Sequence, residues 1–361
     1  MTEMIPAAKP IIGDEEREAV DRVLRSGMIA GGPEVAAFET EFSELVSGRH
    51  SIAVNSGTSA LHMAFVAAGI KAGDEVIVPS FTFAATANSV VLAGGTPVFA
   101  DIEQDYFNMD PKAAEAAITP RTRALMPVHL YGHPAAMREY KDIAARHNLL
   151  LFEDAAQAHA AALDDIPVGA WGVAASFSFY PTKNMTSGEG GMVTTPCDHI
   201  ARKTKLLRNQ GMEKRYENEI AGYNTRMTDI HAAIGRVQLK KLAGWTKQRQ
   251  DNAKFLDDNL KGVVVPPVAP GATHVYHQYT IRVVDQDRDK FAEEIGKRGI
   301  GSGVYYPIPN HRLPSYGLTL DLPVTEQVAK QCLSLPVHPS LSQGDLEKIV
   351  EVINSVASAG A

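Results

Sequence analysis

The stretch Ser176-Phe-Ser-Phe-Tyr-Pro-Thr-Lys183-Asn-Met-Thr-Ser-Gly-Glu-Gly-Gly-Met-Val-Thr-Thr195 decides the fold of this chain. Two short β-rich runs, 176–180 and 191–195, flank a polar, glycine-rich turn that carries a single lysine. Upstream, the apolar run 149–152 ends in Glu153 and Asp154. This pattern is typical of a buried parallel strand that presents an acid at its carboxyl end. A lysine and an aspartate are therefore expected on neighbouring strand ends.

Lys183 and Asp154 are the two kinds of group that pyridoxal phosphate requires. The lysine forms a Schiff base with the cofactor, and the carboxylate pairs with the pyridinium nitrogen so that the ring remains an electron sink. Taken alone, each residue has a simpler interpretation. A lysine in a polar turn is more often a solvated surface residue, and an aspartate that ends a strand is often a helix cap.

A second motif precedes this pair in the chain. Residues 51–65 predict a strand, a turn made by Gly57, Thr58 and Ser59, and then a helix rich in alanine, leucine and methionine. Backbone N–H groups at such a helix start, together with two hydroxyls, form an anion site suited to a phosphate. The alternative for this motif alone is an ordinary Ser/Thr helix cap.

The order of these and other motifs resembles a known family, the DegT/StrS family of nucleotide-sugar aminotransferases, which are fold-type-I pyridoxal phosphate enzymes. The resemblance extends from about residue 5 to the final helix. The motifs that carry it are Asn55-Ser-Gly-Thr-Ser-Ala-Leu61, Pro79-Ser-Phe-Thr-Phe-Ala-Ala-Thr-Ala-Asn88, His129-Leu-Tyr-Gly132, Glu153-Asp-Ala-Ala-Gln-Ala-His159, the stretch 176–183 and Tyr223-Asn-Thr-Arg-Met227.

The resemblance implies catalytic roles for Lys183 and Asp154. Lys183 would hold the cofactor and later move the substrate's proton between its carbon and the cofactor. Both tasks need a neutral amine, so we expect the pKa of Lys183 to be lowered by burial or by a nearby positive charge. Some relatives carry histidine at this position and catalyse dehydrations, which the lysine here argues against. Asp154 would face the pyridine nitrogen.

Three further residues are implied to surround the cofactor ring. Gln157 would hydrogen-bond the phenolic oxygen, unless it satisfies a nearby backbone group instead. Phe83 would stack on one face of the ring, and its alternative is a place in the core. His159 is equally compatible with a cofactor contact and with a buried, structural histidine. Ala160 departs from the glycine usual in the family, which puts only the local backbone geometry in doubt.

The phosphate contacts implied by the resemblance come from several segments. Gly57, Thr58 and Ser59 would bind it at the helix start, and Ser178 would donate to it. Asn224 corresponds to the family's contact from the neighbouring subunit, so a homodimer with shared active sites is expected. Hydroxyls, amides and an asparagine give enough donors for a phosphate without an arginine. Arg226 is the nearest cation and is expected to support this loop.

The substrate side is less defined in the sequence. Tyr306 and His311 lie in a segment that resembles the family's border of the sugar pocket, and a proline-stiffened surface loop is the alternative. The glycine-rich segment 26–33 resembles a flexible loop near the substrate entrance. The expected substrates are a nucleotide-linked keto-sugar and L-glutamate. A keto-cyclitol aminotransferase and a non-catalytic, cofactor-bound regulator are the alternatives, and neither the nucleotide nor the sugar is identified.

Composition agrees with this interpretation and excludes other classes of protein. The 361 residues are 45% hydrophobic and carry a net charge of −7, so a nucleic-acid backbone is not an expected partner. Apolar runs end well before 18 residues and the opening residues lack signal-peptide features, so neither a membrane helix nor secretion is expected. Cys197 and Cys332 are too few for a disulfide framework or a zinc site. No metal is expected, and the predicted location is the cytoplasm.

The periodicity of the chain predicts an α/β fold. Helices are expected at 14–25 and 33–47, and from 51 to 195 strands alternate with helices, which indicates a mostly parallel central sheet flanked by helices. The apolar stripe after Met227 predicts one helix to Leu242, and a charged helix follows to about residue 261. The proline-rich segment 263–271 suggests a boundary between a large domain, 1–262, and a smaller α+β domain, 263–361.

Overall fold

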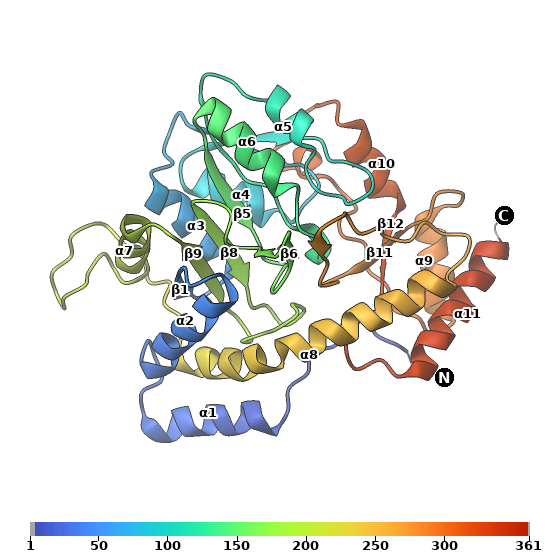
Figure 1. The fold of residues 1–361 in the computed structure, drawn as a ribbon, viewed down its shortest axis with the longest axis horizontal. Coiled ribbons are helices and arrows are strands. Elements are labelled where there is room, and N and C mark those ends of the chain that lie inside the picture. Colours follow the sequence, from blue (N-terminus) through green and yellow to red (C-terminus); the bar gives the residue numbers. More distant parts are fainter. Residues whose placement is uncertain (1–3, 360–361) are drawn as a thin grey trace.

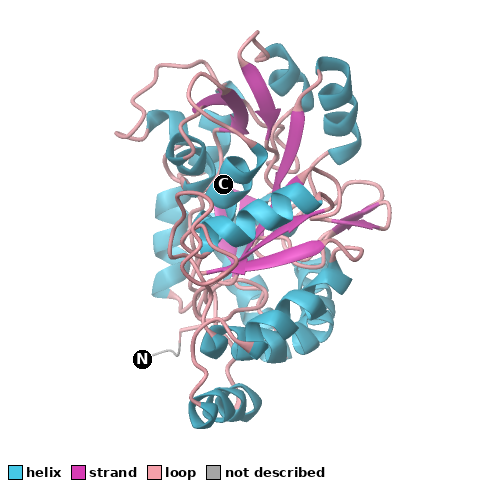
Figure 2. Cartoon of the chain, turned by 90° about the vertical axis from the view of Figure 1, so that its left-hand side faces the viewer, coloured by secondary structure: helices cyan, strands magenta, loops and turns pink. Residues whose placement is uncertain are grey.

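The computed structural model describes residues 4–359 and is built on a seven-stranded sheet with helices on both faces (Figures 1 and 2). Residues 1–3, which belong to the opening analysed above for signal-peptide features, lie outside the described residues, as do the last two. The strand order is β1-β9-β8-β5-β4-β2-β3. The strands are β1 (His50–Val54), β2 (Glu75–Pro79), β3 (Thr96–Ala100), β4 (Thr122–Leu125), β5 (Leu150–Asp154), β8 (Ala174–Ser178) and β9 (Gly191–Thr195).

One strand of this sheet runs against the other six. β9 pairs in antiparallel fashion with both β1 and β8, whereas all other neighbours are parallel. The carboxyl ends of the six parallel strands therefore meet at one edge of the sheet, and the chain enters β9 from that same edge. This arrangement confirms the predicted mostly parallel α/β fold, and ligands bind at this edge in such sheets.

The strands are apolar on both sides because both faces of the sheet are covered. In β2, Val76 and Val78 pack into one core together with the helices α3, α4 and α7, and Ile77 packs into a core on the opposite face with α6. α2 and the first half of α8 cover that opposite face nearer β1. These helices are α2 (Pro33–Leu45), α3 (Gly57–Ala68), α4 (Ala85–Leu92), α5 (Pro111–Ala116), α6 (Met137–His147), α7 (Asp198–Arg208) and α8 (Asp229–Asn259).

The long helix α8 joins the sheet to a second group of elements (Figure 1). Its last part contributes Ala253 and Leu256, and the residue after it contributes Leu260, to a separate core formed with the two-stranded sheet of β11 and β12. The elements of this region are β11 (Tyr279–Arg282), α9 (Arg288–Lys297), α10 (Pro323–Gln331), β12 (Cys332–Leu335) and α11 (Gln343–Ala359). The division of the chain into domains at residue 262 remains a prediction.

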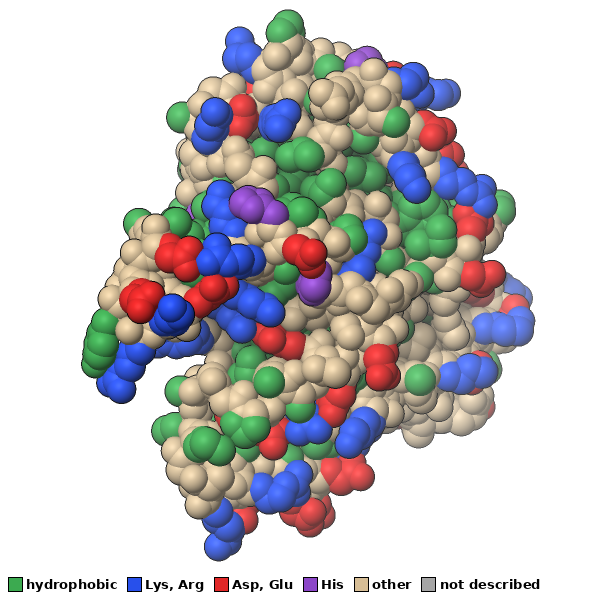
Figure 3. All heavy atoms as spheres, turned by 60° about the vertical axis from the view of Figure 1, so that its left-hand side comes forward, with side chains coloured by type: hydrophobic (Ala, Val, Ile, Leu, Met, Phe, Trp, Pro, Cys, Tyr) green, Lys and Arg blue, Asp and Glu red, His purple; other side chains and the backbone are tan. Residues whose placement is uncertain are grey.

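Most predicted elements agree with the structure, and the departures have physical causes. The sequence of residues 303–306 predicts a strand, and this prediction is wrong, because Gly303 forms only an isolated bridge to Ser334. Helix α1 (Asp14–Ser26) follows the prediction, but Leu24 is exposed because the helix packs on α8 through Ala19 and Val23. Helix α7 and strand β12 were not predicted. The segment 209–224 after α7 forms an arm that stands away from the body (Figures 1 and 3).

Candidate active site

Lys183 and Asp154 lie at the same edge of the sheet. Asp154 is the last residue of β5, and its register partner on the parallel neighbour β8 is Ser176. Lys183 follows β8 in the turn that leads to β9, where its backbone N–H donates to the carbonyl of Tyr180. The expected pairing of a lysine and an aspartate on neighbouring strand ends is therefore present.

The Asp154 carboxylate is buried and held by two hydrogen bonds. Its Oδ2 accepts from the hydroxyl of Thr86 at 2.8 Å, and its Oδ1 accepts from the backbone N–H of Ala156 at 3.1 Å. Burial raises the pKa of Asp154, whereas Thr86, Ala156 and the charge of Lys183 oppose that shift. These contacts fix the direction of the carboxylate and leave it short of positive partners, as suits a group that receives a cation from a ligand.

The amine of Lys183 is made less basic by its surroundings. Burial lowers its pKa to about 8, and the nearby Asp154 carboxylate counteracts part of this shift. A lysine with this pKa has a substantial neutral fraction near neutral to mildly alkaline pH, which nucleophilic attack and proton transfer both require. The predicted lowering of the Lys183 pKa agrees with the structure.

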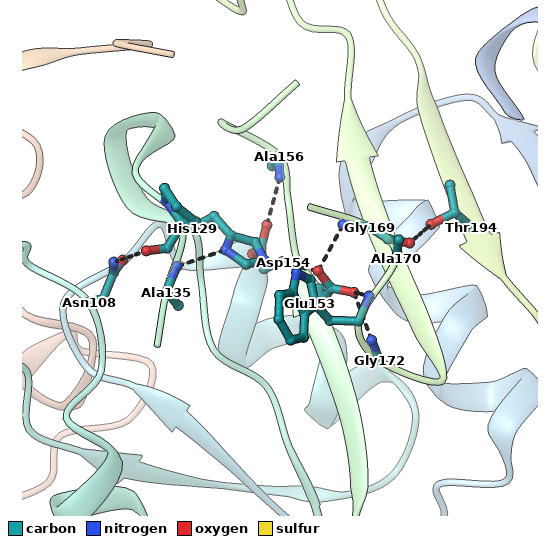
Figure 4. A network of polar contacts seen from close by, with 12 residues as sticks. Asn108, His129, Ala135, Glu153, Asp154, Ala156, Gly169, Ala170, Gly172 and Thr194 are labelled. Carbon is teal, nitrogen blue, oxygen red and sulfur yellow. Dashed lines mark hydrogen bonds and ion pairs between the residues drawn. The ribbon is translucent and has the colours of Figure 1, made fainter. Parts of the chain in front are cut away.

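A buried polar network lies directly behind Asp154 (Figure 4). Glu153 is fully buried and accepts hydrogen bonds from the backbone N–H groups of Gly169, Trp171 and Gly172 at 2.8–2.9 Å. The Nε2 atom of His129 lies 3.2 Å from the same carboxylate, and its Nδ1 accepts from the N–H of Ala135. Nδ1 is therefore unprotonated and Nε2 carries the proton. Burial alone would raise the pKa of Glu153, but His129 and the backbone N–H donors outweigh burial and lower this pKa. The network anchors the end of β5.

Side chains with aromatic or polar groups surround the Asp154 end of the site. Gln157 accepts from the N–H of Tyr131 at 2.7 Å and donates to the hydroxyl of Tyr306 at 3.2 Å, so it does satisfy a backbone group and keeps one amide hydrogen for a ligand. Phe83 is 59% exposed, which excludes the alternative that it is a core residue. Its ring lies 6.0 Å from that of Tyr306. An exposed aromatic face is thus available beside the predicted cofactor position.

His159 is fully buried between Phe177 and Phe179, with ring centroids 5.4 and 5.6 Å away. Among residues 4–359, neither of its ring nitrogens has a hydrogen-bond partner of normal geometry. Burial and the neighbouring charge of Lys183 lower its pKa to about 3, so the ring is neutral. A buried imidazole without partners at this position is compatible with a ligand contact as well as with a structural role.

A phosphate-sized anion has donors at the start of α3. The N-cap Ser56 accepts from the N–H of Ser59, and the Ser59 hydroxyl donates to Asn55, so Ser59 is already engaged. Within the described chain, no hydrogen bond occupies the N–H groups of Gly57 and Thr58 or the Thr58 hydroxyl. A Cβ at Gly57 would lie 2.7 Å from the Cβ of Ser178, so the helix start and β8 are in close contact. These groups form a cradle that fits a phosphate.

Asn224 lies at the base of the arm formed by residues 209–224. Its side chain is exposed and makes no hydrogen bond among the described residues, and its backbone bridges to Asn209. Arg226 donates to the side chain of Asn209 at 2.9 Å, which agrees with the predicted supporting role. The arm, the glycine-rich loop and helix α2 enclose a cleft of about 320 Å³ that Gly31, Gly32 and Arg226 line.

The structure separates the two predicted substrate residues. Tyr306 lies beside Phe83 and Gln157, at the edge of the site. His311 is fully buried, with Nδ1 2.6 Å from the hydroxyl of Ser80 and Nε2 3.1 Å from Glu326. Its expected direct contact with substrate does not agree with this placement, because both ring nitrogens are engaged. His311 instead ties the segment after Tyr306 to the carboxyl end of β2.

Several residues of the site had no assigned role in the sequence analysis. Thr86, Glu153 and His129 all fall inside the quoted motifs, but a single sequence does not reveal which hydroxyl or carboxylate turns inward. The hydroxyl of Thr86 in α4 lies 3.1 Å from that of Thr82, which precedes the helix, and their spacing in the sequence does not reveal this contact.

The residues at this edge fit pyridoxal phosphate. The N–H groups of Gly57 and Thr58 suit the phosphate, a lysine of lowered pKa suits the aldehyde, and a buried carboxylate that forms no ion pair among residues 4–359 suits the pyridinium nitrogen. Phe83 offers an exposed face for the ring. The fold and these side chains define a fold-type-I α/β transferase site.

The family follows from comparison with known proteins. Residues 10–354 match the model of the DegT/DnrJ/EryC1/StrS aminotransferase family, and the chain belongs to this family. It is 39% identical, over 98% of its length and 95% of the relative, to the dTDP-3-amino-3,4,6-trideoxy-alpha-D-glucose transaminase of Streptomyces venezuelae. It is 40% identical, over 94% of its length and 93% of the relative, to the pleiotropic regulatory protein of Geobacillus stearothermophilus.

A solved structure supports the same assignment. The PLP form of the putative sugar aminotransferase Spr1654 from Streptococcus pneumoniae superimposes with a TM-score of 0.95 at 27% identity, covering 99% of this chain and all of that one. The chain is therefore an aminotransferase with the predicted fold. In residues 4–359 no helix is both long and apolar enough to cross a membrane.

Proposed function

We propose that this aminotransferase uses pyridoxal phosphate to move the amino group of L-glutamate to a nucleotide-linked keto-sugar. The observation that carries the proposal is the pair formed by Lys183, whose pKa is lowered to about 8, and the buried Asp154 at one sheet edge. The unoccupied donors of Gly57 and Thr58 and the exposed ring of Phe83 support the same cofactor.

The side chains have separate tasks in this proposal. When bound, pyridoxal phosphate supplies an electron sink that stabilises negative charge at the substrate carbon. Lys183 would hold the aldehyde end of the cofactor through its amine, and the neutral amine would carry a proton to and from the substrate carbon. Asp154, oriented by Thr86, keeps the ring nitrogen protonated.

The remaining residues bind and orient the cofactor. Gly57, Thr58 and Ser178 hold the phosphate, and Ser59 contributes through the cap that fixes the helix start. Gln157 has one free amide hydrogen for the phenolic oxygen, and Phe83 covers one ring face. Asn224 would reach the phosphate of a partner subunit in a homodimer, which its exposed side chain supports.

The sugar substrate rests on the names of relatives and on the family. One relative is named a dTDP-amino-sugar transaminase and one solved structure a putative sugar aminotransferase. Tyr306 is proposed to border the sugar site, because it lies next to Phe83. We also propose the domain boundary between residues 262 and 263, which the separate core around β11 and β12 supports.

A second candidate is a cofactor-bound regulator without turnover. The name of the Geobacillus relative, a pleiotropic regulatory protein, favours it. The pair of Lys183 and Asp154 favours the enzyme, because a regulator that only holds the cofactor needs no amine that moves a proton to and from a substrate.

The two candidates differ in the fate of the amino group. Holoprotein is incubated with ¹⁵N-labelled L-glutamate and a panel of nucleotide-linked keto-sugars or cyclic ketones, and products are measured by mass spectrometry. The proposal predicts 2-oxoglutarate release and ¹⁵N in an amino-sugar nucleotide. If ¹⁵N appeared only in an amino-cyclitol, the substrate would be a keto-cyclitol and not a nucleotide-linked keto-sugar. If the protein bound the cofactor but transferred no ¹⁵N, the regulator would be favoured.

A further inference from the structure

Arg249 is a buried cation on helix α8. Its side chain, on α8, is 7% exposed, and its Nη1 donates to the backbone carbonyl of Tyr276 at 3.1 Å. Among residues 4–359 no carboxylate forms an ion pair with it, and its Nε has no hydrogen-bond partner. Burial lowers its pKa to about 10, so it remains charged at neutral pH. Leaving the buried Nε–H of a guanidinium unpaired is costly.

Arg249 and Lys183 line the same small cavity. Its volume is about 20 Å³, which is room for one or two water-sized groups. A carboxylate head group has that size, whereas a sugar ring does not. His277, also buried, lies close enough to both Lys183 and Arg249 for each charge to lower its pKa, after the larger effect of burial. Arg249 and the lysine that carries the reactive amine therefore share one cavity.

The charge around this cavity selects an anion. Lys9, Lys183 and Arg249 line it together with neutral side chains that include Asn184, Gln238 and Trp245, and no aspartate or glutamate of the described chain does so. A planar guanidinium matches a carboxylate through two parallel hydrogen bonds. The cavity is thus suited to a carboxylate held by Arg249.

We propose that Arg249 binds a carboxylate of the amino donor, an inference that rests on the proposed aminotransferase function. The amino donor must bring its α-carbon to Lys183, so one of its carboxylates comes within reach of a cavity that this lysine lines. In a purely structural role, Arg249 would only fix the Tyr276 carbonyl. The two roles differ in whether Arg249 affects donor binding.

The test compares Arg249→Met and Arg249→Lys with wild-type holoenzyme. Because amino transfer divides into two half-reactions, the donor and the keto-sugar can be measured separately. We expect Arg249→Met to raise the KM for L-glutamate by roughly 30-fold or more. The kcat/KM for the keto-sugar should stay within a factor of about two to three, the usual context scatter of such measurements. Arg249→Lys, which lacks the fork of donors, should lie between wild type and Arg249→Met.

Arg288→Met is the matched control. Arg288 is also 7% exposed and donates to backbone carbonyls, those of Ala329 and Cys332, but it does not line the cavity. Its loss should lower the melting temperature without changing the KM for L-glutamate. L-Glutamine serves to separate the two carboxylates. If its KM rises as much as that of glutamate, the α-carboxylate is bound, and if only glutamate is affected, the γ-carboxylate is bound.

A binding measurement keeps the inference independent of turnover. Trp245 lines the cavity, and in a Trp171→Phe background it is the only tryptophan. Glutarate should change the fluorescence of Trp245 in the Trp171→Phe protein. It should not do so when Arg249→Met is added. The inference would be overturned if folded Arg249→Met kept the wild-type KM for L-glutamate and still bound glutarate. If Arg249→Met fails to fold, the same result for Arg249→Lys would overturn it. If the wild-type enzyme released no 2-oxoglutarate from L-glutamate, the proposed function would be refuted instead. The glutarate measurement would still show whether Arg249 binds a carboxylate.

Discussion

The carboxylate of Asp154 accepts a 2.8 Å hydrogen bond from the hydroxyl of Thr86, which joins the end of β5 to helix α4. Thr86 is itself 3.1 Å from the hydroxyl of Thr82, so the acid belongs to a short chain of buried polar groups. Its direction is fixed before any ligand binds. Such preorganisation is the form in which a protein stabilises charge most effectively.

Replacing this carboxylate should abolish most activity while preserving the fold. An amide at Asp154→Asn fits the same space but cannot balance the pyridinium charge. We expect turnover to fall by about 10²–10³-fold or more, the range for loss of one preorganised electrostatic contact. Thr86→Val should cause a smaller decrease, because it only frees the carboxylate. Steady-state rates and thermal unfolding check both variants, and near-wild-type turnover of Asp154→Asn would refute the assigned role.

The pKa of Lys183 makes a prediction about pH and stability. It is about 8 in the folded protein and ordinarily 10.5, so between these values the unfolded chain binds a proton that the folded chain does not. Stability therefore rises with pH across this window, and protonated Lys183 is unfavourable below pH 8. Without cofactor, Lys183→Met should be more stable than wild type below pH 8, and the difference should shrink toward pH 10.5. Denaturant unfolding across this range measures it, and a difference independent of pH would contradict the lowered pKa.

The close approach of α3 to β8 can be tested at Gly57. A methyl group there would lie 2.7 Å from the Cβ of Ser178, so Gly57→Ala must push the phosphate cradle open. We expect weaker cofactor binding in an absorbance titration. Gly244→Ala is the control, because a Cβ at Gly244 meets no atom within 4 Å and the residue lies within helix α8. The control should gain about 0.5–1 kcal/mol of stability with unchanged cofactor affinity. Equal affinities in both variants would argue against the cradle.

Shared active sites can be tested by mixing two inactive proteins. Lys183→Ala lacks the reactive amine, and Asn224→Asp places a carboxylate beside the partner's phosphate, which weakens cofactor binding by repulsion. If Asn224 crosses to the partner, a mixed dimer contains one site with intact Lys183 and intact Asn224, and activity returns. Native mass spectrometry establishes subunit exchange. Exchange without recovery of activity would show that the sites are not shared.

The sequence was most informative where side chains follow backbone periodicity. Apolar runs predicted β2 and β5 because both faces of the sheet are buried, and the run that ends in Asp154 located the acid. The lysine turn between β8 and β9 was equally clear, because a polar, glycine-rich segment separates two β-rich runs.

The sequence predictions differ from the structure at residues whose role depends on tertiary contacts. Arg249 lies in a charged stretch of α8 and has the pattern of a solvated helix residue, yet it is buried and donates to the carbonyl of Tyr276. His311 has the pattern of an accessible loop residue between prolines, yet Ser80 and Glu326 enclose it. Partners that lie 200 or more positions away, as Ser80 does from His311, leave no local signal.

The central claim, that Lys183 is the amine to which the cofactor attaches, is tested most directly by trapping with borohydride. Protein purified with pyridoxal phosphate is reduced, digested and mapped by peptide mass spectrometry. The account predicts one pyridoxyl-phosphate adduct, on the peptide that contains Lys183, and none in Lys183→Ala. An adduct that persists in Lys183→Ala, or that maps to another lysine in the wild type, would contradict it.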